Sequence, residues 1–325
     1  MVAVPETFMI PFILRRLAGF AVTLLVAALA IFWLLDLLPG DPAQFTLGIN
    51  ATPEAVQLLR QQMGLDAPAP ARFVSWIWGM LGGDFGMSHT QRAPVAALIW
   101  GRLGVTVPLA LFAMGLSMAV GLPLGILAAR RRGKALDTAI MVLAQTGIAV
   151  PGFWLGMLLA LLFAVNLRWL PPGGFTPWHE DAGAALRSLV LPSLALALPQ
   201  ASILARVMRT ALVDVTGQDF IRTARAKGLT MDEAVWRHGV RNALLPVLTI
   251  LGLQFAFLIA GTIIVENVFY LPGLGRLIFT AISERDLILV RGATMILVIA
   301  VTLTMLLTDL AYGLVDPRLR EGAGA

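Results

Sequence analysis

Long apolar blocks alternate with short polar segments along the whole 325-residue chain. Six blocks are long enough to cross a hydrocarbon layer of about 30 Å as helices. We expect these spans at residues 13–36, 104–129, 137–165, 189–212, 244–269 and 288–312. The pattern predicts an all-α membrane protein with about six transmembrane helices.

The first apolar block, Leu17–Leu38, directly follows Arg15 and Arg16. A cleavable signal peptide is the competing interpretation, because Ala28-Leu29-Ala30 matches a small-residue cleavage pattern. The apolar run continues beyond that point and is longer than a signal peptide requires. We therefore expect a retained first helix.

The spans divide the chain into three parts. Residues 1–36 form a cytoplasmic N-terminus with the first helix, and residues 37–103 form a periplasmic segment with surface helices. Within that segment, Arg72–Gly86 is too short to span a membrane. Residues 104–325 form a core domain of five helices with a loop at 213–243 and a short cytoplasmic tail.

Glycine and proline residues mark expected contacts and bends within the spans. Gly121/Gly125 and Gly152/Gly156 have the spacing that lets membrane helices approach closely. Pro151-Gly152 lies near the middle of the third span, where a break is tolerated if it lines a cavity or packs on protein. We expect a kink there.

Composition supports a membrane protein. The chain is 58% hydrophobic and 13% charged, and its mean hydropathy is +0.83. It contains no cysteine, which excludes disulfides and cysteine-based metal sites. The formal charge of +5 does not require a nucleic-acid partner, because in a membrane protein the distribution of positive residues sets orientation.

Most of the 24 Arg and Lys residues fall on one predicted side of the membrane. The short turn with Arg130, Arg131, Arg132 and Lys134 is the clearest case, since short loops weigh most in orientation. The distribution predicts cytoplasmic N- and C-termini and a cytoplasmic segment at Arg222–Pro246.

The Arg222–Pro246 segment is basic and carries signals for two helices. "DFIRTARAKG" is expected to continue the fourth span, with Gly228 in a helix-stop position. Thr230 and Glu233 have capping-box spacing, which predicts a second helix leading to the fifth span. A solvated basic loop held by anionic lipid is the alternative, at about 1 kcal/mol per basic residue. The stop followed by a new cap favours an ordered element that docks a partner.

Motifs for catalysis are missing from the sequence. Arg132-Gly133-Lys134 is followed by Ala135 and position 128 is alanine, so no phosphate-binding loop is present. The near nucleophile elbow Gly115–Ala119 has the wrong last residue, and there is no H-E-x-x-H. The histidines His89, His179 and His238 are far apart. We therefore expect neither an enzyme nor a metal site.

Several polar or kinked positions in the spans are candidates for the substrate pathway. Interhelical hydrogen bonds are the alternative role for the glutamines. Glu266, near the outer mouth, either contacts substrate or a binding protein or fixes the outer loop. The candidates are Gln145, Pro151, Gln200, Gln254 and Glu266.

A series of motifs resembles a known family. "DFIRTARAKGL" followed by "HGVRNALLPVLT" resembles the cytoplasmic loop of permease subunits in ABC importers. "FILRRL", "LPGDP", "GDFGMS", "FYLPGLGRLI" and "LAYGLVDPRLR" occur in the same order as in the B-type permeases of the peptide/nickel/glutathione group. The resemblance covers nearly the whole chain.

The resemblance implies a type I ABC importer permease fold in a bacterial inner membrane. It implies a homologous second permease, two cytoplasmic ABC ATPase subunits, a periplasmic substrate-binding protein and membrane lipid as partners. No cofactor is expected on this chain, because ATP and Mg²⁺ belong to the ATPase subunits. The loop residues implied to couple to the ATPase are Arg222, Thr223, Ala224, Arg225, Ala226, Lys227, Gly228, Leu229, His238, Arg241 and Asn242.

The loop departs from the general importer motif, which has a Glu-Ala-Ala triplet before its glycine. With Gly228 as that glycine, the triplet positions hold Arg222, Thr223 and Ala224. The peptide branch commonly has this pattern, so a docking salt bridge from the missing glutamate is not carried over.

Two other classes of protein remain as alternatives. A stand-alone secondary transporter would show repeated halves and deep ionisable residues. A scaffold would only recruit a protein through the basic loop. Within the permease class, peptide, glutathione, nickel-chelate and opine cargo stay open, although the short 166–188 connection is more typical of the glutathione and nickel types.

Overall fold

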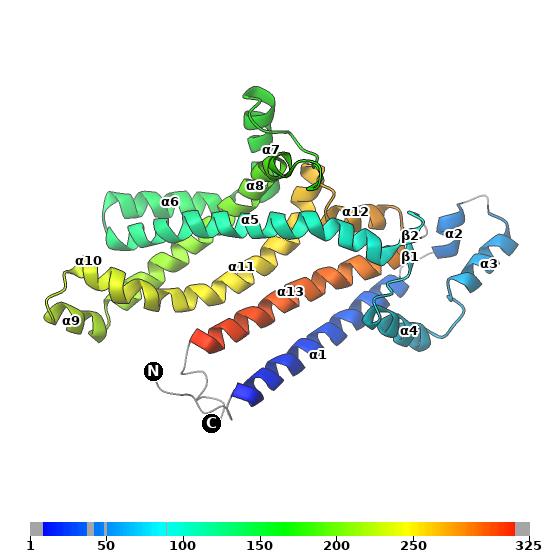
Figure 1. Ribbon diagram of the computed structural model, residues 1–325, viewed down its shortest axis with the longest axis horizontal. Coiled ribbons are helices and arrows are strands. Elements are labelled where there is room, and N and C mark those ends of the chain that lie inside the picture. Colours follow the sequence, from blue (N-terminus) through cyan, green and yellow to red (C-terminus); the bar gives the residue numbers. More distant parts are fainter. Residues whose placement is uncertain (1–8, 38–41, 49–50, 89, 316–325) are drawn as a thin grey trace.

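The computed structural model describes residues 9–37, 42–48, 51–88 and 90–315, and it is almost entirely helical (Figure 1). Two strands pair as a short antiparallel hairpin. The elements are α1 (Met9–Asp36), α2 (Pro42–Leu47), α3 (Pro53–Gln62), α4 (Ala69–Leu81), β1 (Met87–Ser88), β2 (Ala93–Pro94), α5 (Val95–Arg130), α6 (Ala135–Ala149), α7 (Gly152–Leu159), the π-helical η2 (Ala160–Asn166), α8 (Ala182–Thr216), α9 (Asp219–Ala226), α10 (Met231–Ala234), the π-helical η3 (Val235–Gly239), α11 (Val240–Val268), α12 (Leu274–Ser283) and α13 (Leu287–Val315).

Five helical segments within the described residues are long and apolar enough to cross a membrane. A sixth span is formed if α6 and α7–η2, which are bent by 99°, count as one. The predicted set of about six spans is therefore confirmed. The five unbroken segments are Ile13–Asp36, Val95–Arg130, Ala182–Thr216, Met231–Val268 and Leu287–Leu310.

The bend in the third span lies at Val150 and Pro151. Val150 has extended backbone angles of −82° and 121°, and Pro151 caps the start of α7. A residue before proline is driven out of the helical region, because the proline ring collides with its backbone. The predicted kink at Pro151-Gly152 is confirmed.

Two helices begin seven or more residues earlier than the hydropathy pattern predicted. α5 begins at Val95 rather than 104, and α8 begins at Ala182 rather than 189. The Asp181 carboxylate caps α8 by accepting hydrogen bonds from the Gly183 and Ala184 amides at 2.8 and 3.0 Å. Hydropathy detects the part of a helix that lies in hydrocarbon, whereas capping sets where the helix starts.

Closely packed glycines join α5 to α8. A Cβ atom at Gly121 would lie 2.9 Å from Cβ of Leu204, and one at Gly125 would lie 2.7 Å from Cβ of Met208. On α7, a Cβ atom at Gly156 would lie 3.3 Å from Cβ of Ala195. The close approach predicted from both glycine pairs is confirmed.

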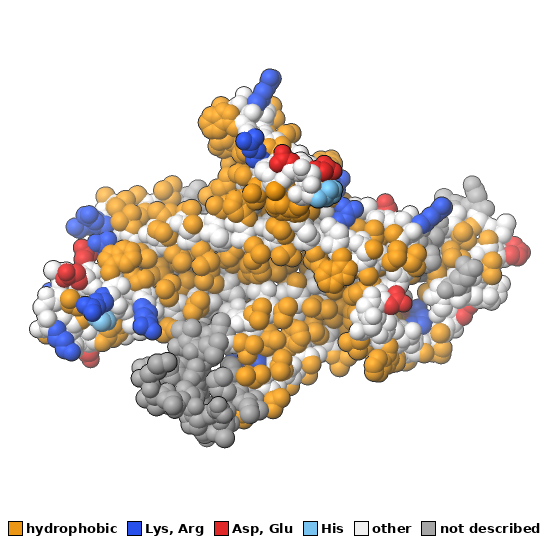
Figure 2. Space-filling model, in the orientation of Figure 1, with side chains coloured by type: hydrophobic (Ala, Val, Ile, Leu, Met, Phe, Trp, Pro, Cys, Tyr) orange, Lys and Arg blue, Asp and Glu red, His pale blue; other side chains and the backbone are white. Residues whose placement is uncertain are grey.

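The main apolar core lies where α5, α8 and α11 meet. Leu109, Leu191 and Leu258 supply one fully buried side chain from each helix. α11 packs in turn on α13, and α13 packs on α1, so α1 lies at the edge of the bundle (Figure 1). Charged side chains gather at the α9–α10 end, on the α7–α8 connection and towards the α2–α4 end, while hydrophobic side chains cover the middle (Figure 2).

The end of the bundle opposite α9–α10 is held together by a buried aspartate. The Asp286 carboxylate accepts hydrogen bonds from the Ser88 and Thr90 hydroxyls at 2.6 and 2.7 Å. It also accepts one from the Leu289 amide in the first turn of α13 at 3.0 Å. These bonds explain the "GDFGMS" motif, because its serine fixes the hairpin segment to the α12–α13 turn.

Substitution of Gly125 by alanine should destabilise the bundle. The new methyl group would meet the Ala205 carbonyl oxygen at 2.6 Å, so α5 and α8 would have to separate. We expect a loss of about 1–3 kcal/mol, measured as a lower Tm of the purified protein in detergent. Gly115→Ala is the matched control, since nothing lies within 4 Å of its added Cβ. Equal Tm values for the two variants would contradict close packing of α5 on α8 at Gly125.

Candidate functional site

The polar loop between α8 and α11 starts with a break. α8 ends at Thr216, Gly217 follows as its C-cap, and α9 begins at Asp219. Gln218 between them has an extended backbone, with φ −79° and ψ 154°. The expectation that "DFIRTARAKG" continues the fourth span is therefore wrong. It forms a separate helix, because the chain leaves the helical conformation at Gln218.

α9 ends in a Schellman motif centred on Gly228. The Gly228 amide donates to the Arg225 carbonyl oxygen at 2.9 Å, and the Leu229 amide donates to the Ala224 carbonyl oxygen at 3.3 Å. Gly228 has φ +97°, a left-handed conformation that glycine adopts without strain. The helix-stop role predicted for Gly228 is confirmed.

α10 begins with the predicted capping box. The Glu233 amide donates to the Thr230 hydroxyl at 3.3 Å, and the Thr230 amide donates to the Glu233 carboxylate at 2.8 Å. The helix then continues through η3 into α11, as predicted. The loop is thus ordered by local hydrogen bonds at both of its helices.

A small apolar core of its own holds α9 against α10. Ile221, Ala224 and Ala234 are buried together, and Leu229 packs on them. The side chain of Ala224 therefore points into the loop, and only 8% of the residue is exposed. A bulky residue at Ala224 would test the folding of the loop rather than its outer surface.

Other predicted coupling residues are exposed on the loop surface. Arg222, Thr223, Arg225, Ala226, Lys227 and Gly228 are exposed on and just after α9. His238, Arg241 and Asn242 are exposed on the turn into α11, where the Asn242 amide group donates to the His238 carbonyl oxygen at 2.7 Å.

Three large apolar side chains on the same loop were missed by the sequence analysis. Phe220, Met231 and Trp236 are 37%, 41% and 53% exposed. Their neighbours Ile221 and Val235 are buried, so the sequence alone does not show which of the apolar residues point outward. Their presence in an otherwise charged segment was the available signal.

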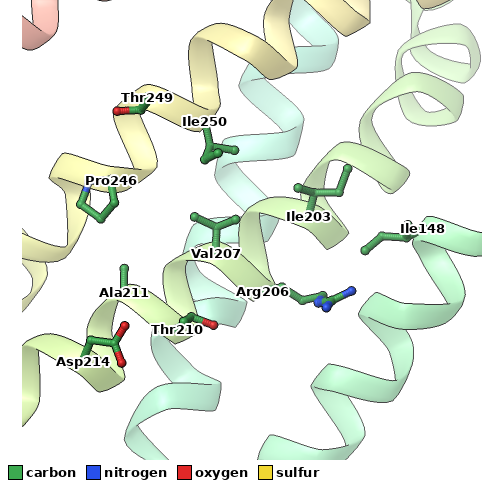
Figure 3. A pocket seen from close by; sticks show the side chains of 10 residues that line it. All are labelled: Ile148, Ile203, Arg206, Val207, Thr210, Ala211, Asp214, Pro246, Thr249 and Ile250. Carbon is green, nitrogen blue, oxygen red and sulfur yellow. The ribbon is translucent and has the colours of Figure 1, made fainter.

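A groove of about 720 Å³ opens between α8 and α11, near the ends of these helices that join the loop (Figure 3). Ile148, at the end of α6 before the bend, forms a third side. The apolar wall of the groove consists of Ile148, Ile203, Val207, Ala211, Pro246 and Ile250.

Three polar residues of the groove form a stripe along α8, and Thr249 adds a hydroxyl group from α11 (Figure 3). Arg206, Thr210 and Asp214 recur every four residues and therefore share one helix face. Arg206 is exposed and donates a hydrogen bond to the Gln145 side chain on α6 at 2.9 Å. It lies ten residues before the end of α8, roughly 15 Å along the helix.

The residues predicted for the substrate pathway do not converge on one site. Gln145 reaches the groove through Arg206, whereas Pro151 is an exposed residue at the bend. Oε1 of Gln200 and Nε2 of Gln254 are buried without a hydrogen-bond partner in the described part of the chain. Contact of Gln145, Gln200 and Gln254 with cargo stays a prediction.

Glu266 is fully buried at the end of the bundle opposite α9–α10 and fixes the connection between α11 and α12. Its carboxylate accepts hydrogen bonds from the Thr106 hydroxyl at 2.6 Å and from the Arg276 amide at 3.0 Å. The Thr106 hydroxyl in turn accepts from the Leu274 amide at 2.8 Å. These contacts join α5, α11 and α12, and they leave the carboxylate no exposure to a passing solute.

Within the described residues, no three His, Asp or Glu side chains are grouped so that they could hold a metal ion. His179 and His238 are exposed, and His89 lies outside the described residues.

A bundle of apolar spans with an ordered polar loop defines a multi-pass membrane protein. The chain belongs to the family described as binding-protein-dependent transport system inner membrane component, whose profile matches residues 121–321. The profile of the N-terminal part of such membrane components matches residues 9–110. It is a permease subunit of an ABC importer of the inner membrane, as the motif resemblance implied.

Curated relatives cover almost the whole chain. A protein of Brucella abortus strain 2308, named as a peptide transport system permease, is 42% identical over 95% of this chain and 98% of its own length. The glutathione transport system permease protein GsiC of Salmonella choleraesuis is 41% identical over 96% of this chain and 99% of its own. These full-length similarities give no support to the stand-alone transporter.

Solved structures show the same fold at low sequence identity. A chain of the MetNI methionine ABC transporter, in an inward-facing conformation, matches 67% of this chain and 96% of its own length. The TM-score is 0.57 and the sequence identity is 18%, so the likeness concerns the fold alone.

Replacement of Gly228 by valine should disorder the loop, whereas replacement by asparagine should not. Nothing lies within 4 Å of a Cβ atom at Gly228, so both side chains fit and only the backbone conformation discriminates between them. Asparagine tolerates a positive φ, but valine pays roughly 1–2 kcal/mol. Amide hydrogen exchange of residues 219–239 should accelerate in Gly228→Val only. Similar protection in both variants would show that the Schellman turn does not order the loop.

Proposed function

We propose that this subunit forms half of the translocation pathway and that a cytoplasmic ATPase subunit docks on the α9–α10 loop. The observation that carries the proposal is the loop itself. It has a small apolar core separate from that of the bundle, and it presents charged and large apolar side chains outward. ATP and Mg²⁺ bind to the ATPase subunits, and this chain contributes no catalytic residue or cofactor of its own.

The order of the loop favours protein docking over a lipid tether. Attraction to anionic lipid requires only basic side chains near the surface. It needs neither the Schellman motif at Gly228 nor the capping box at Thr230. A rigid docking element needs both, because ordering the loop in advance lowers the entropy lost on binding.

The exposed apolar residues suggest where the contact is centred. Phe220, Met231 and Trp236 together expose a large apolar area next to the basic residues of α9. Apolar groups rimmed by charges are typical of interaction sites, and a few aromatic residues commonly supply most of the binding energy. These three side chains would fill a hydrophobic pocket on the ATPase, while Arg222 and Arg225 meet its rim.

A charged residue deep in α8 supports a second permease as partner. Exposed Arg206 would face hydrocarbon if α8 bordered lipid, which is costly for a guanidinium group. The cost disappears if the α8–α11 groove faces a water-filled pathway. A homologous second permease would close the open side of that groove and complete the pathway, while lipid covers the apolar outer face of α1.

The opposite end of the molecule is proposed to face the periplasm and to receive the binding protein. It carries α2–α4 and the β1–β2 hairpin, whereas the α5–α6 turn with its basic cluster lies at the α9–α10 end (Figure 1). The positive-inside rule supports a cytoplasmic location for that end and, with it, the proposed cytoplasmic location of both termini.

Peptides or peptide-like solutes are the proposed cargo. The support is the printed names of the relatives, which are a peptide permease and a glutathione permease. Both cargo types carry carboxylate and ammonium groups, and the stripe of Arg206, Thr210 and Asp214 offers both charges and a hydroxyl group to such a solute.

Single cysteines should reveal opposite sidedness for the loop and the α7–α8 connection. The native chain has no cysteine, so a single introduced thiol reports on its own position. In intact cells a membrane-impermeant maleimide should label His179→Cys but not Lys227→Cys, and both should react after lysis. Labelling of Lys227→Cys in intact cells would place the loop outside and overturn the proposed ATPase contact.

Truncation of the exposed apolar residues should weaken binding of the ATPase subunits. Phe220→Ala and Met231→Ala each remove an exposed side chain, and each should cost about 1–2 kcal/mol or roughly tenfold in affinity. Co-purification from membranes that contain the cognate ATPase subunits measures the effect. Trp78→Ala on α4 is the matched control, because that side chain is 70% exposed at the other end. Unchanged recovery in both loop variants would contradict docking at this surface.

A further inference from the structure

Arg130, the last residue of α5, forms a salt bridge with the loop between α8 and α11. Nη2 of Arg130 lies 2.8 Å from Oδ2 of Asp232, and Nε donates to Oδ1 at 3.1 Å. The guanidinium carbon also lies 5.8 Å from the centre of the Trp236 ring. Arg130 precedes the α5–α6 turn and Asp232 is the second residue of α10, so the pair joins two parts of the chain that are 102 residues apart.

The charges of this pair suit the helix ends that carry them. Arg130 lies in the last turn of α5, where the backbone carbonyls are partly negative, and Asp232 lies in the first turn of α10, where the amides are partly positive. Two parallel N–H···O bonds also fix the relative direction of the two groups, which a single contact does not. The geometry is therefore directional as well as attractive.

A second pair fixes the other side of the same turn. Nε and Nη2 of Arg209 donate to the two oxygens of Asp137 at 2.7 and 2.8 Å. The Gly133 amide donates to the same carboxylate at 3.0 Å, and the Asp137 side chain is only 5% exposed. The start of α6 is thereby fixed to α8, and the turn lies between two bidentate pairs.

An apolar cluster beneath the pairs extends this connection into the bundle. Met208 and Leu212 of α8 pack with Val235 of η3 and Val247 of α11, and Ile126 of α5 packs against the cluster. The loop therefore shares a continuous core with α8 and α11. Ala129, next to the α5–α6 turn, packs on the same cluster, and the Arg130–Asp232 pair adds a polar link between the turn and α10 at the surface.

Covalent continuity explains why that surface pair matters. α9 follows α8 and α10 leads into α11, so a displaced loop moves these two helices directly. α5 and α6 have no such connection to the loop, although Ile148 of α6 forms one side of the groove. Without Arg130–Asp232, the α5–α6 turn would keep only its apolar packing below η3, and the first turn of α10 would lose its directional contact with the turn.

We propose that Arg130 and Asp232 are positioning residues that hold α10 against the α5–α6 turn, so that movement of the loop reaches all three sides of the groove. The inference rests on the proposed docking function. Neither residue contacts cargo or nucleotide, and the pair acts through the position of the loop.

Charge reversal tests this inference in the isolated chain and in the assembled importer. Spin labels at Lys227→Cys and Leu136→Cys report the distance between the loop and the start of α6 in lipid nanodiscs. Asp232→Arg should broaden this distance distribution, since two arginines then face each other. Arg130→Asp with Asp232→Arg should narrow it again in part, because the ion pair returns while each charge now opposes the dipole of its helix end. The Asp232 side chain is 66% exposed, so an arginine fits at this position without entering a core. An unchanged gel-filtration profile and an unchanged Tm will show that the variants fold.

In the importer assembled with its cognate ATPases and binding protein, the readout is solute transported per ATP hydrolysed. Asp232→Arg should lower this ratio by about two- to thirtyfold while the ATPase subunits still co-purify, and the double reversal should recover part of the loss. An unchanged ratio and distance in the single variant, or a double variant that stays as impaired as the single variant in both, would overturn the inference. Failure of the unmodified chain to bind the ATPases would instead overturn the docking function, and the distance measurement would then decide the role of the pair.

Discussion

The cost of placing charge in a hydrocarbon layer governs the arrangement of this protein. A charged side chain in a membrane span must be paired, reach the interface or face water. Asp137 and Arg209 satisfy one another in a nearly buried pair, and Arg206 bonds Gln145 at the edge of a groove. These few charges therefore join α6 to α8 at two points.

The bundle combines a tightly packed end near the loop with a third span that is bent. Near the loop, α5, α8 and α11 share one apolar cluster and close glycine contacts, which resist relative sliding. α6, in contrast, ends at the 99° bend before Pro151. Relative movement of α6 and α7 is therefore easier to accommodate at the bend than within the close packing near the loop.

The loop combines local and tertiary order in a way that matches a mechanical role. Local hydrogen bonds at Gly228 and Thr230 form its helices, and the core of Ile221, Ala224 and Ala234 holds them together. The core residues face inward, whereas the side chains of Phe220, Met231 and Trp236 are exposed on the loop surface. A loop built in this way can receive force on its outer side without unfolding, because its internal contacts do not depend on the partner.

The sequence by itself determined the spans, the kink at Pro151, the glycine contacts and the cap at Thr230, because hydropathy, proline sterics and capping act over a few neighbouring residues. The break at Gln218 was missed, since no proline marks it. The inward direction of Ala224, the burial of Glu266 and the pairing of Arg130 with Asp232 were decided only by the tertiary structure. Each depends on which distant segments meet, and a contact across 102 or 160 residues leaves no periodic signal in a single chain.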